Sequence, residues 1–239
     1  LTYADLKNFH KKYYHPSNAV FFSYGNLDAI ELQREIESSV LSKFTPQSDI
    51  FRVNPEPVFE EEKYTQSFYN PLPDDKENHH VVTAWLLDTT KDPVDHLEAC
   101  LLENILLDNS SSPLRKALEG TDLGKAPSAI TFMETEQKQM AFVAGLEGVG
   151  KGKEKEVEGL ILSVFKDLVS NGIGQDLIEA SLHQIEISQR EISGGMPYGL
   201  QLLLGTMPSI LHDSNPLEVL DLEGSLSKLK KRLEEPNHL

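Results

Sequence analysis

Apolar residues recur at helical spacing through most of the second half of the chain. They predict one helix centred on Val157–Leu168, others over about 175–192 and 198–211, and a last helix that starts at Asn215. Gly172 favours the end of the first of these helices, because glycine readily adopts the left-handed conformation of a C-cap. The second half of the chain is therefore predicted to be helical.

The middle of the chain mixes alternating patterns with helix-start signals. Alternation predicts strands over 63–70, 79–88, 129–134 and 138–146, with Thr135-Glu136-Gln137 closing a hairpin between the last two. Along this hairpin Ile130 and Phe132 face one side, as do Met140, Phe142, Ala144 and Leu146. The loop between the first two strands carries Pro71, Pro73, Asp74 and Asp75.

Two helices are predicted between these strands. Asp92-Pro93-Val94-Asp95 combines a cap, a first-turn proline and an acid, and predicts a helix to about Leu107. Ser112-Pro113 predicts a shorter helix ending near Gly120. Antiparallel hairpins followed by helices indicate an α+β fold.

A separate unit is predicted at the start. Thr2 and Asp5 can cap a helix to about Tyr14, a short strand should cover Asn18–Tyr24, and a second helix should run from Leu27 to about Phe44. Residues 46–62 hold three prolines and an acidic run, which few helices or strands tolerate. We therefore divide the chain into residues 1–45, a linker over 46–62, and a domain over 63–239. Because the first residue is not methionine and a helix cap follows at once, we expect a piece of a longer protein.

Charge narrows the range of partners. The chain has 22 Lys and Arg against 38 Asp and Glu, a formal net charge of −16. This charge would repel phosphates, so nucleic acid is not an expected partner, and a cationic or neutral partner fits better. No stretch approaches the ~20 apolar residues of a membrane span. The single cysteine, Cys100, lies among leucines at helical spacing and is predicted to be a packed core thiol in a reducing compartment.

Two segments come close to catalytic motifs. Gly145–Gly152 resembles a phosphate-binding loop, but Gly152 replaces the magnesium-binding hydroxyl and Glu147 would place a carboxylate in the cradle. We interpret it as a strand-to-helix turn, with nucleotide binding as a minor alternative. His183-Gln184-Ile185-Glu186-Ile187 resembles an inverted zinc motif, but Ile187 replaces the second histidine. We expect a solvated face with the pairs Glu179–His183 and Glu186–Arg190.

The other candidate side chains have structural interpretations. His79 and His80 should point to opposite faces of a strand, one buried and one exposed. His10 and His15 flank a helix end, where capping or packing is expected. Four basic residues lie on the last predicted helix, and we interpret them as a solvated helix face. They are Lys228, Lys230, Lys231 and Arg232. We assign no catalytic or metal-binding residue, and the substrate-binding residues remain unknown.

Residues 6–26 carry a more specific pattern. They read LKNFHKKYYHPSNAVFFSYGN and contain His10, Tyr14, His15, Pro16, Asn18, Gly25 and Asn26 at the spacing F-H-x-x-x-Y-x-P-x-N followed by G-(D/N). This pattern resembles the insulin-degrading-enzyme and pitrilysin superfamily of zinc metallopeptidases, and most of all its presequence protease branch. The segment that begins Ser112-Pro113-Leu114 resembles that branch's S-P-(F/L)-x-K-A-L, as do shorter stretches at 178–187 and 215–220.

The resemblance implies a fold and a function. It implies a mostly antiparallel sheet covered on one face by helices, and it makes residues 1–45 the end of an upstream catalytic domain. The superfamily binds zinc through His, His and Glu of that domain, so zinc is expected in the parent and none in this fragment. The chain would then be the non-catalytic second domain of a zinc endopeptidase that degrades short unfolded peptides, such as targeting sequences.

The expected partners are the peptide substrate and the remaining domains of the same protein. The expected location is intracellular, either the bacterial cytoplasm or an organelle matrix. The alternative is a scaffold or binding subunit of the same superfamily without protease activity. The upstream sequence of the parent separates the two, since only a protease needs the H-x-x-E-H motif.

Overall fold

The computed structural model of the chain describes residues 1–48, 52–67, 79–192, 195–235 and 238–239. Its helices and strands occur in the following order: α1 (Tyr3–Tyr13), the 3-10 helix η1 (Pro16–Asn18), α2 (Ala29–Ser39), the 3-10 helix η2 (Leu41–Lys43), β1 (His79–Thr89), α3 (Pro93–Leu107), α4 (Pro113–Glu119), β2 (Ala126–Pro127), β3 (Phe132–Glu134), β4 (Gln139–Val149), α5 (Glu154–Asn171), α6 (Gln175–Arg190), α7 (Tyr198–Leu211), α8 (Pro216–Leu220) and α9 (Leu222–Leu233).

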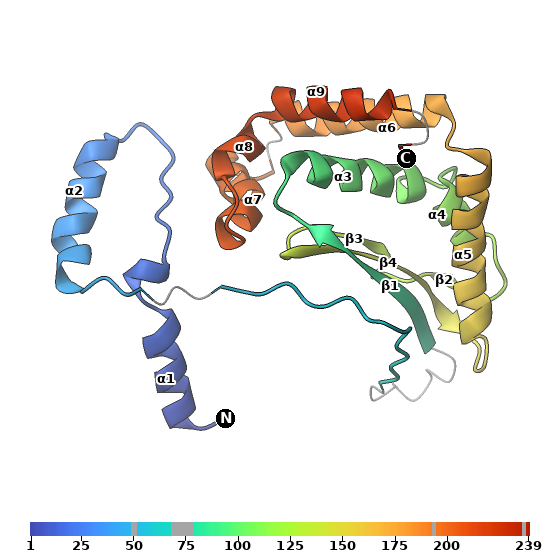
Figure 1. The fold of residues 1–239 in the computed structure, drawn as a ribbon, viewed down its shortest axis with the longest axis horizontal. Coiled ribbons are helices and arrows are strands. Elements are labelled where there is room, and N and C mark those ends of the chain that lie inside the picture. Colours follow the sequence, from blue (N-terminus) through green and yellow to red (C-terminus); the bar gives the residue numbers. More distant parts are fainter. Residues whose placement is uncertain (49–51, 68–78, 193–194, 236–237) are drawn as a thin grey trace.

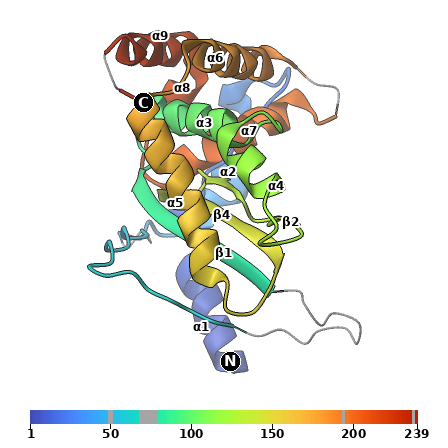
Figure 2. The same ribbon diagram turned by 90° about the vertical axis from the view of Figure 1, so that its right-hand side faces the viewer.

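Strand β4 is the centre of a small antiparallel sheet. It pairs with β1 along one edge and with the short strands β2 and β3 along the other. The hairpin predicted through residues 135–137 forms, with Met133 opposite Phe142 and Phe142 opposite Trp85. Helices α3, α4 and α5 lie on one side of this sheet (Figures 1 and 2). The α+β class and the helical cover on one face are confirmed.

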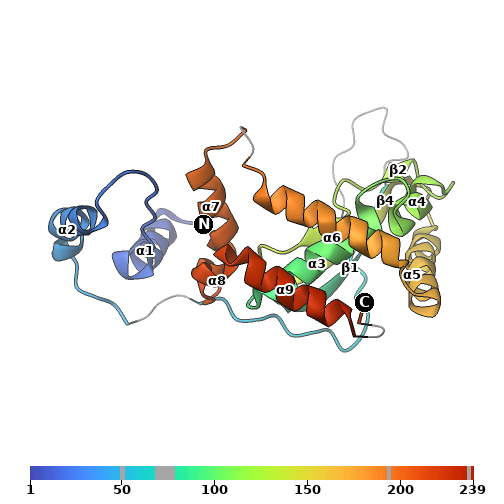
Figure 3. The same cartoon turned by 90° about the horizontal axis from the view of Figure 1, so that it is seen from above.

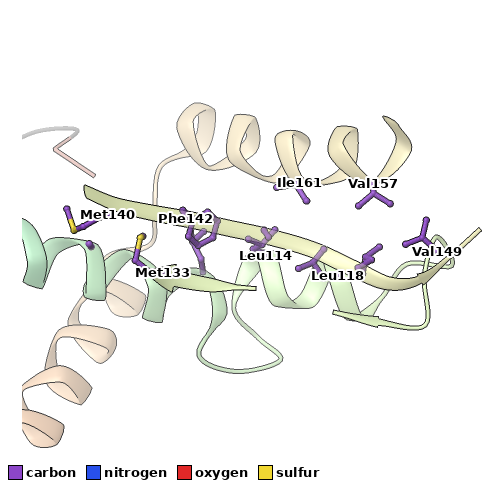
Figure 4. Close-up of a cluster of buried hydrophobic side chains, with 12 residues drawn as sticks. Leu114, Leu118, Met133, Met140, Phe142, Val149, Val157 and Ile161 are labelled. Carbon is purple, nitrogen blue, oxygen red and sulfur yellow. The ribbon is translucent and has the colours of Figure 1, made fainter. Parts of the chain in front are cut away.

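The main core lies between the sheet and these helices. The predicted alternation is confirmed on β4, where Met140, Phe142, Ala144 and Leu146 are all buried. Leucines of α4 and the buried residues Val157 and Ile161 of α5 join the same cluster (Figure 4). Burial of apolar side chains is the main favourable contribution to folding, so this cluster fixes the orientation of the helices on the sheet.

A second layer of helices lies over α3. Helices α6 and α9 run along its far side (Figures 1 and 3), and a second apolar cluster fills the space between the three helices. Its buried members are Val94, Leu97, Leu101, Ile105, Ile185, Leu226 and Leu229. Cys100 packs against this cluster, and burial raises the pKa of its thiol to about 11. The prediction of a core thiol is confirmed.

The charged side chains of α6 and α9 form a different network from the one the sequence predicts. Glu186 pairs with Lys230, and Arg190 pairs with Glu223 at 2.6 Å. The hydrogen bond from Lys230 lowers the pKa of the Glu186 carboxyl. His183 is exposed, as expected. The positive charge of Arg190 also lowers the pKa of Glu186 within α6, but the ion pairs of both side chains are made with α9.

The basic face of α9 is exposed at Lys228, Lys230 and Lys231, as predicted, whereas Arg232 is only partly exposed. Arg232 contacts Asp92, the N-cap of α3, at 3.4 Å, and Asp95 and Glu98 of α3 at 2.6 and 3.0 Å. These contacts raise the pKa of the Arg232 guanidinium, with the Asp95 hydrogen bond as the largest cause. The arginine therefore links the last helix to the start of α3.

Several predicted elements differ in the structure. Residues 19–24 form no strand, since none of the described residues pairs with them, and residues 16–18 form η1 instead. Residues 63–67 pair with no strand in the part of the chain that the structure describes, while the rest of the predicted strand and the loop over 71–78 lie outside it.

Two further differences concern the histidine pair and the last helix. His79 and His80 at the start of β1 are both exposed, so the expectation that one of them is buried is wrong. The last helix is divided at Asp221, whose side chain accepts a hydrogen bond from Gly224 N and caps α9.

Within the described part of the chain, none of the helices combines the length and apolar character needed to cross a bilayer.

Candidate functional site

The first motif, residues 10–26, covers the end of α1, the 3-10 helix η1 and the segment that leads to α2. The His10 ring stacks on Tyr14 at 4.8 Å, and the Tyr14 N–H donates to His10 O at 2.9 Å, which ends the helix. The His15 ring accepts from Ser17 N at 3.1 Å, and Pro16 starts η1. Asn18 donates through its side chain to Tyr13 O at 3.2 Å. These contacts are local and hold the chain in its turn.

The end of this motif reaches α7. Gly25 has a φ of +143°, a conformation that glycine adopts easily, and it is followed by Asn26. Just before it, the Tyr24 ring lies edge-on to Tyr198 at 6.0 Å and directly against Gly199, where an added Cβ would lie 2.4 Å from the ring. Helix α7 therefore contacts the N-terminal unit through a glycine that leaves room for an aromatic ring.

The second motif is the turn between α3 and α4. Ser112 is 1% exposed, and its hydroxyl accepts from Asn109 N and donates to Asn104 O at 3.3 and 3.4 Å. Pro113 occupies the first turn of α4, and Leu114 is fully buried in the main core. This motif thus anchors α4 between α3 and the sheet.

The outer face of the sheet, opposite the helices, is a candidate interaction surface. We define it by Val82, Ala84 and Leu86 of β1, Phe132 of β3, and Ala141 and Val143 of β4. Charged residues border it at one end, where Asp88 follows Leu86 and Glu134 lies opposite Ala141. Val82 and Leu86 are each 39% exposed, and Phe132 is 38% exposed. An antiparallel sheet normally presents polar side chains to water on its free face. A contiguous apolar face instead indicates a surface that contacts another molecule or domain.

Residues 52–56 pass one end of this sheet. Glu56 and Gln139 exchange two hydrogen bonds, from Glu56 N to Gln139 Oε1 at 2.6 Å and from Gln139 Nε2 to Glu56 O at 3.2 Å. Lys138 also donates to the Val53 carbonyl, and Arg52 pairs with Asp213 at 2.6 Å. The linker is therefore fastened to the β3–β4 hairpin and to the end of α7, beside the outer face.

The two segments that come close to catalytic motifs, residues 145–152 and 183–187, form no catalytic site in the described part of the structure. Residues 145–149 belong to antiparallel β4, where Gly148 has a φ of +67°, and Gly152, with a φ of +85°, lies in the turn to α5. The strand-to-helix interpretation of this segment is confirmed. In the described ranges, no three His, Cys, Asp or Glu side chains come together as a possible metal site.

Comparison with protein families matches residues 1–185 to the peptidase M16 inactive domain. This chain belongs to the M16 inactive-domain family. The match covers more than three quarters of the chain and includes both motifs and the whole sheet. The resemblance to the presequence protease branch is likewise confirmed by individual relatives.

The relatives are longer than this chain. A chloroplastic and mitochondrial presequence protease from Arabidopsis thaliana is 34% identical over 98% of the chain, and Protein HypA from Clostridium perfringens is 33% identical over 98%. The chain spans 22% and 24% of their lengths. Among solved structures, a protease from Helicobacter pylori aligns with 97% of the chain and 56% of its own, with a TM-score of 0.58 and 19% identity, which supports the fold.

Sequence patterns did not single out the outer face of this M16 domain. The alternation in β1 and β4 was visible, but both faces of these strands are apolar, so the pattern could not say which face the helices cover. One feature of the sequence did point to the outer face: no charged residue occurs between Val81 and Leu87, although a strand with one face in water normally carries polar or charged side chains on that face.

Proposed function

We propose that this chain is the non-catalytic second domain of a zinc-dependent endopeptidase that degrades short unfolded peptides, such as targeting sequences. In this proposal residues 1–45 complete the upstream catalytic domain and residues 63–239 form the second domain. The apolar outer face walls the peptide chamber, and the helical layers support it from behind. The protein works in an organelle matrix or the bacterial cytoplasm.

The outer face is the observation that carries this proposal. An unfolded peptide exposes varied apolar side chains, and a broad apolar sheet can contact them without requiring one sequence. The net charge of −16 adds selectivity, because mitochondrial and chloroplast targeting peptides are rich in arginine and poor in acids. The relative from Arabidopsis thaliana, named a presequence protease, supports the same substrate class.

The N-terminal unit supports the division into domains. Helices α1 and α2 lie to one side of the sheet and its helices (Figure 1), and they bury none of their own residues. Large apolar side chains stay exposed there, among them Leu6, Phe9 and Phe21 at 64%, 55% and 54%. Apolar surface of this extent is expected where a further part of the protein packs.

Zinc in the parent would be held outside this chain. Three protein ligands and a water are the usual set of a catalytic zinc. His183 is exposed, and Ile187 stands where the motif needs its second histidine. Residues 183–187 therefore do not provide the ligand set of a catalytic zinc, and no catalytic step is assigned to them.

The purified chain is expected not to hydrolyse peptides. Metal analysis should find less than about one tenth of an equivalent of zinc, because a stable site needs three or four protein ligands. The matched control is the parent protein, which should contain zinc and cleave the same model peptide. Stoichiometric zinc in the chain, or chelator-sensitive cleavage by it, would contradict the proposal.

In the parent protein, Leu86→Asp should raise the KM for an apolar peptide about tenfold, equivalent to ~1.4 kcal/mol of lost binding. Leu86 belongs to the outer face, opposite Ala141 of β4, so a carboxylate there must be desolvated when a peptide binds. The control is Val169→Asp, which adds the same charge at a side chain that is 88% exposed near the end of α5.

Steady-state kinetics of the Leu86→Asp and Val169→Asp variants measure the KM for the apolar peptide. Equal KM values for the two variants would remove the outer face from the peptide chamber. If the parent proves to have no peptidase activity, binding of a labelled peptide replaces the KM measurement. The same Leu86 effect on binding would then favour the scaffold alternative.

A further inference from the structure

A cavity of about 450 Å³ opens on the helical side of the domain, away from the outer face. It lies between the C-terminal end of α3, helix α4 and the segment that joins β2 to β3. Its volume is within the range of ~300–1,000 Å³ that small-ligand pockets occupy. The polar side chains that line it are Glu103, Asn104, Asp108, Arg115, Glu119, Ser128 and Thr131.

Ser128 gives this cavity an unused hydrogen-bonding group. The residue is 4% exposed, and its backbone N–H is paired with Gly145 O at 2.9 Å. Its hydroxyl oxygen is buried and has no partner among the described residues. Buried hydroxyl groups are nearly always hydrogen-bonded, so an unpaired one that lines a cavity indicates a group that binds there.

The charges around the cavity favour a cation. Glu103 is held in place because one carboxylate oxygen accepts from Met133 N at 2.8 Å. Asp108 lies at the C-cap of α3, where the helix dipole adds further negative potential. Within the described ranges, neither carboxylate takes part in an ion pair.

The one cation in the lining is already neutralised. Arg115 Nε contacts Glu119 Oε1 at 2.8 Å, and its Nη1 donates to Leu107 O at 3.3 Å. The hydrogen bond from Arg115 lowers the pKa of the Glu119 carboxyl, so this pair stays charged and balanced near neutral pH. Glu103 and Asp108 therefore leave the cavity with two uncompensated negative charges.

We propose that this cavity binds an ammonium or guanidinium group. Such a group donates to Ser128 Oγ, to the second carboxylate oxygen of Glu103 and to the side-chain carbonyl of Asn104, and it balances the charge of Asp108. The group can come from a lysine or arginine side chain of a peptide or from a free polyamine. The assignment is independent of the proposed chamber, because it uses the opposite side of the domain.

Calorimetric titration of the 239-residue chain tests the proposal. The probes are spermidine and three short peptides that differ at one central position, which is lysine, arginine or norleucine. We expect spermidine, a basic peptide, or both to bind, and the norleucine peptide to bind at least about tenfold more weakly. Binding of spermidine would identify a free polyamine as the ligand, and binding of the lysine or arginine peptide would identify a basic side chain.

Two variants locate the site. Ser128→Ala and Glu103→Gln should each weaken the bound probe about tenfold, and both keep the shape of the side chain they replace. The control Glu37→Gln removes the same charge from an exposed position on α2 and should leave binding unchanged. Thermal unfolding of each variant verifies the fold, and Ser128→Ala should be no less stable than the wild type.

The proposal is overturned if none of the basic probes binds. It is also overturned if Glu103→Gln and Glu37→Gln weaken binding equally, because the effect would then come from net charge alone. Binding that survives Ser128→Ala unchanged would likewise remove the group from this cavity. None of these outcomes bears on the kinetic test of Leu86.

Discussion

Phe165→Ala is expected to lower the free energy of unfolding by about 3 kcal/mol, the lower end of the range for removing a packed phenylalanine. The Phe165 ring is half-buried and lies 5.4 Å from Trp85 and 6.1 Å from Phe142, measured between ring centroids. It therefore joins α5 to both long strands. A loss of this size is a large share of the 5–15 kcal/mol that stabilises a typical domain.

Denaturant melts with and without added zinc measure this effect against His183→Ala. His183 is exposed on α6, so its loss should cost no more than about 0.5 kcal/mol in either condition. Equal losses for the two variants would mean that α5 does not hold the sheet as described. A loss for His183→Ala that appears only with zinc would indicate a metal ligand on α6.

Gly145→Ala is expected to cost about 2–3 kcal/mol through overpacking between β1 and β4. A Cβ at this position would lie 2.1 Å from Val81 O and 2.7 Å from Val82 Cα, both backbone atoms that can move only with their strand. The Gly145 amide and carbonyl are also bonded to Thr131 and Ser128, which prevents β4 from shifting away.

The matched control is Gly159→Ala in α5, where an added Cβ would meet nothing within 4 Å. Alanine is the better helix former, so this variant should be more stable by about 0.5–1 kcal/mol. Thermal melts of the two variants should therefore shift in opposite directions. A neutral Gly145→Ala would show that β1 and β4 are farther apart than the structure places them.

The candidate surfaces were harder to predict than the elements. The cavity at Ser128 combines residues from α3, α4 and the β2–β3 segment, which sequence spacing cannot place together. Strand β2 is only two residues long and has no pattern of its own. The outer face required knowing which side of β1 the helices cover, and that is decided by packing over long sequence separations.

The sequence by itself determined most helix ends and the family. Asp92 caps α3, Pro113 starts α4, Gly172 follows α5 with a φ of +76°, and α7 has the predicted bounds, because capping and turn chemistry act between neighbouring residues. The motifs at residues 10–26 and 112–114 indicated the superfamily. Each motif forms its contacts between residues close together in the chain, so its pattern is visible in the sequence alone.

Only the tertiary structure decided which elements find partners. Residues 19–24 have the composition of a strand, but a strand forms only when a second one supplies hydrogen bonds, and none of the described residues does so. Glu186 and Arg190 had suitable partners within α6, yet α9 lies close enough to pair with both. Pairing and packing depend on distances in space, which a pattern along the chain does not contain.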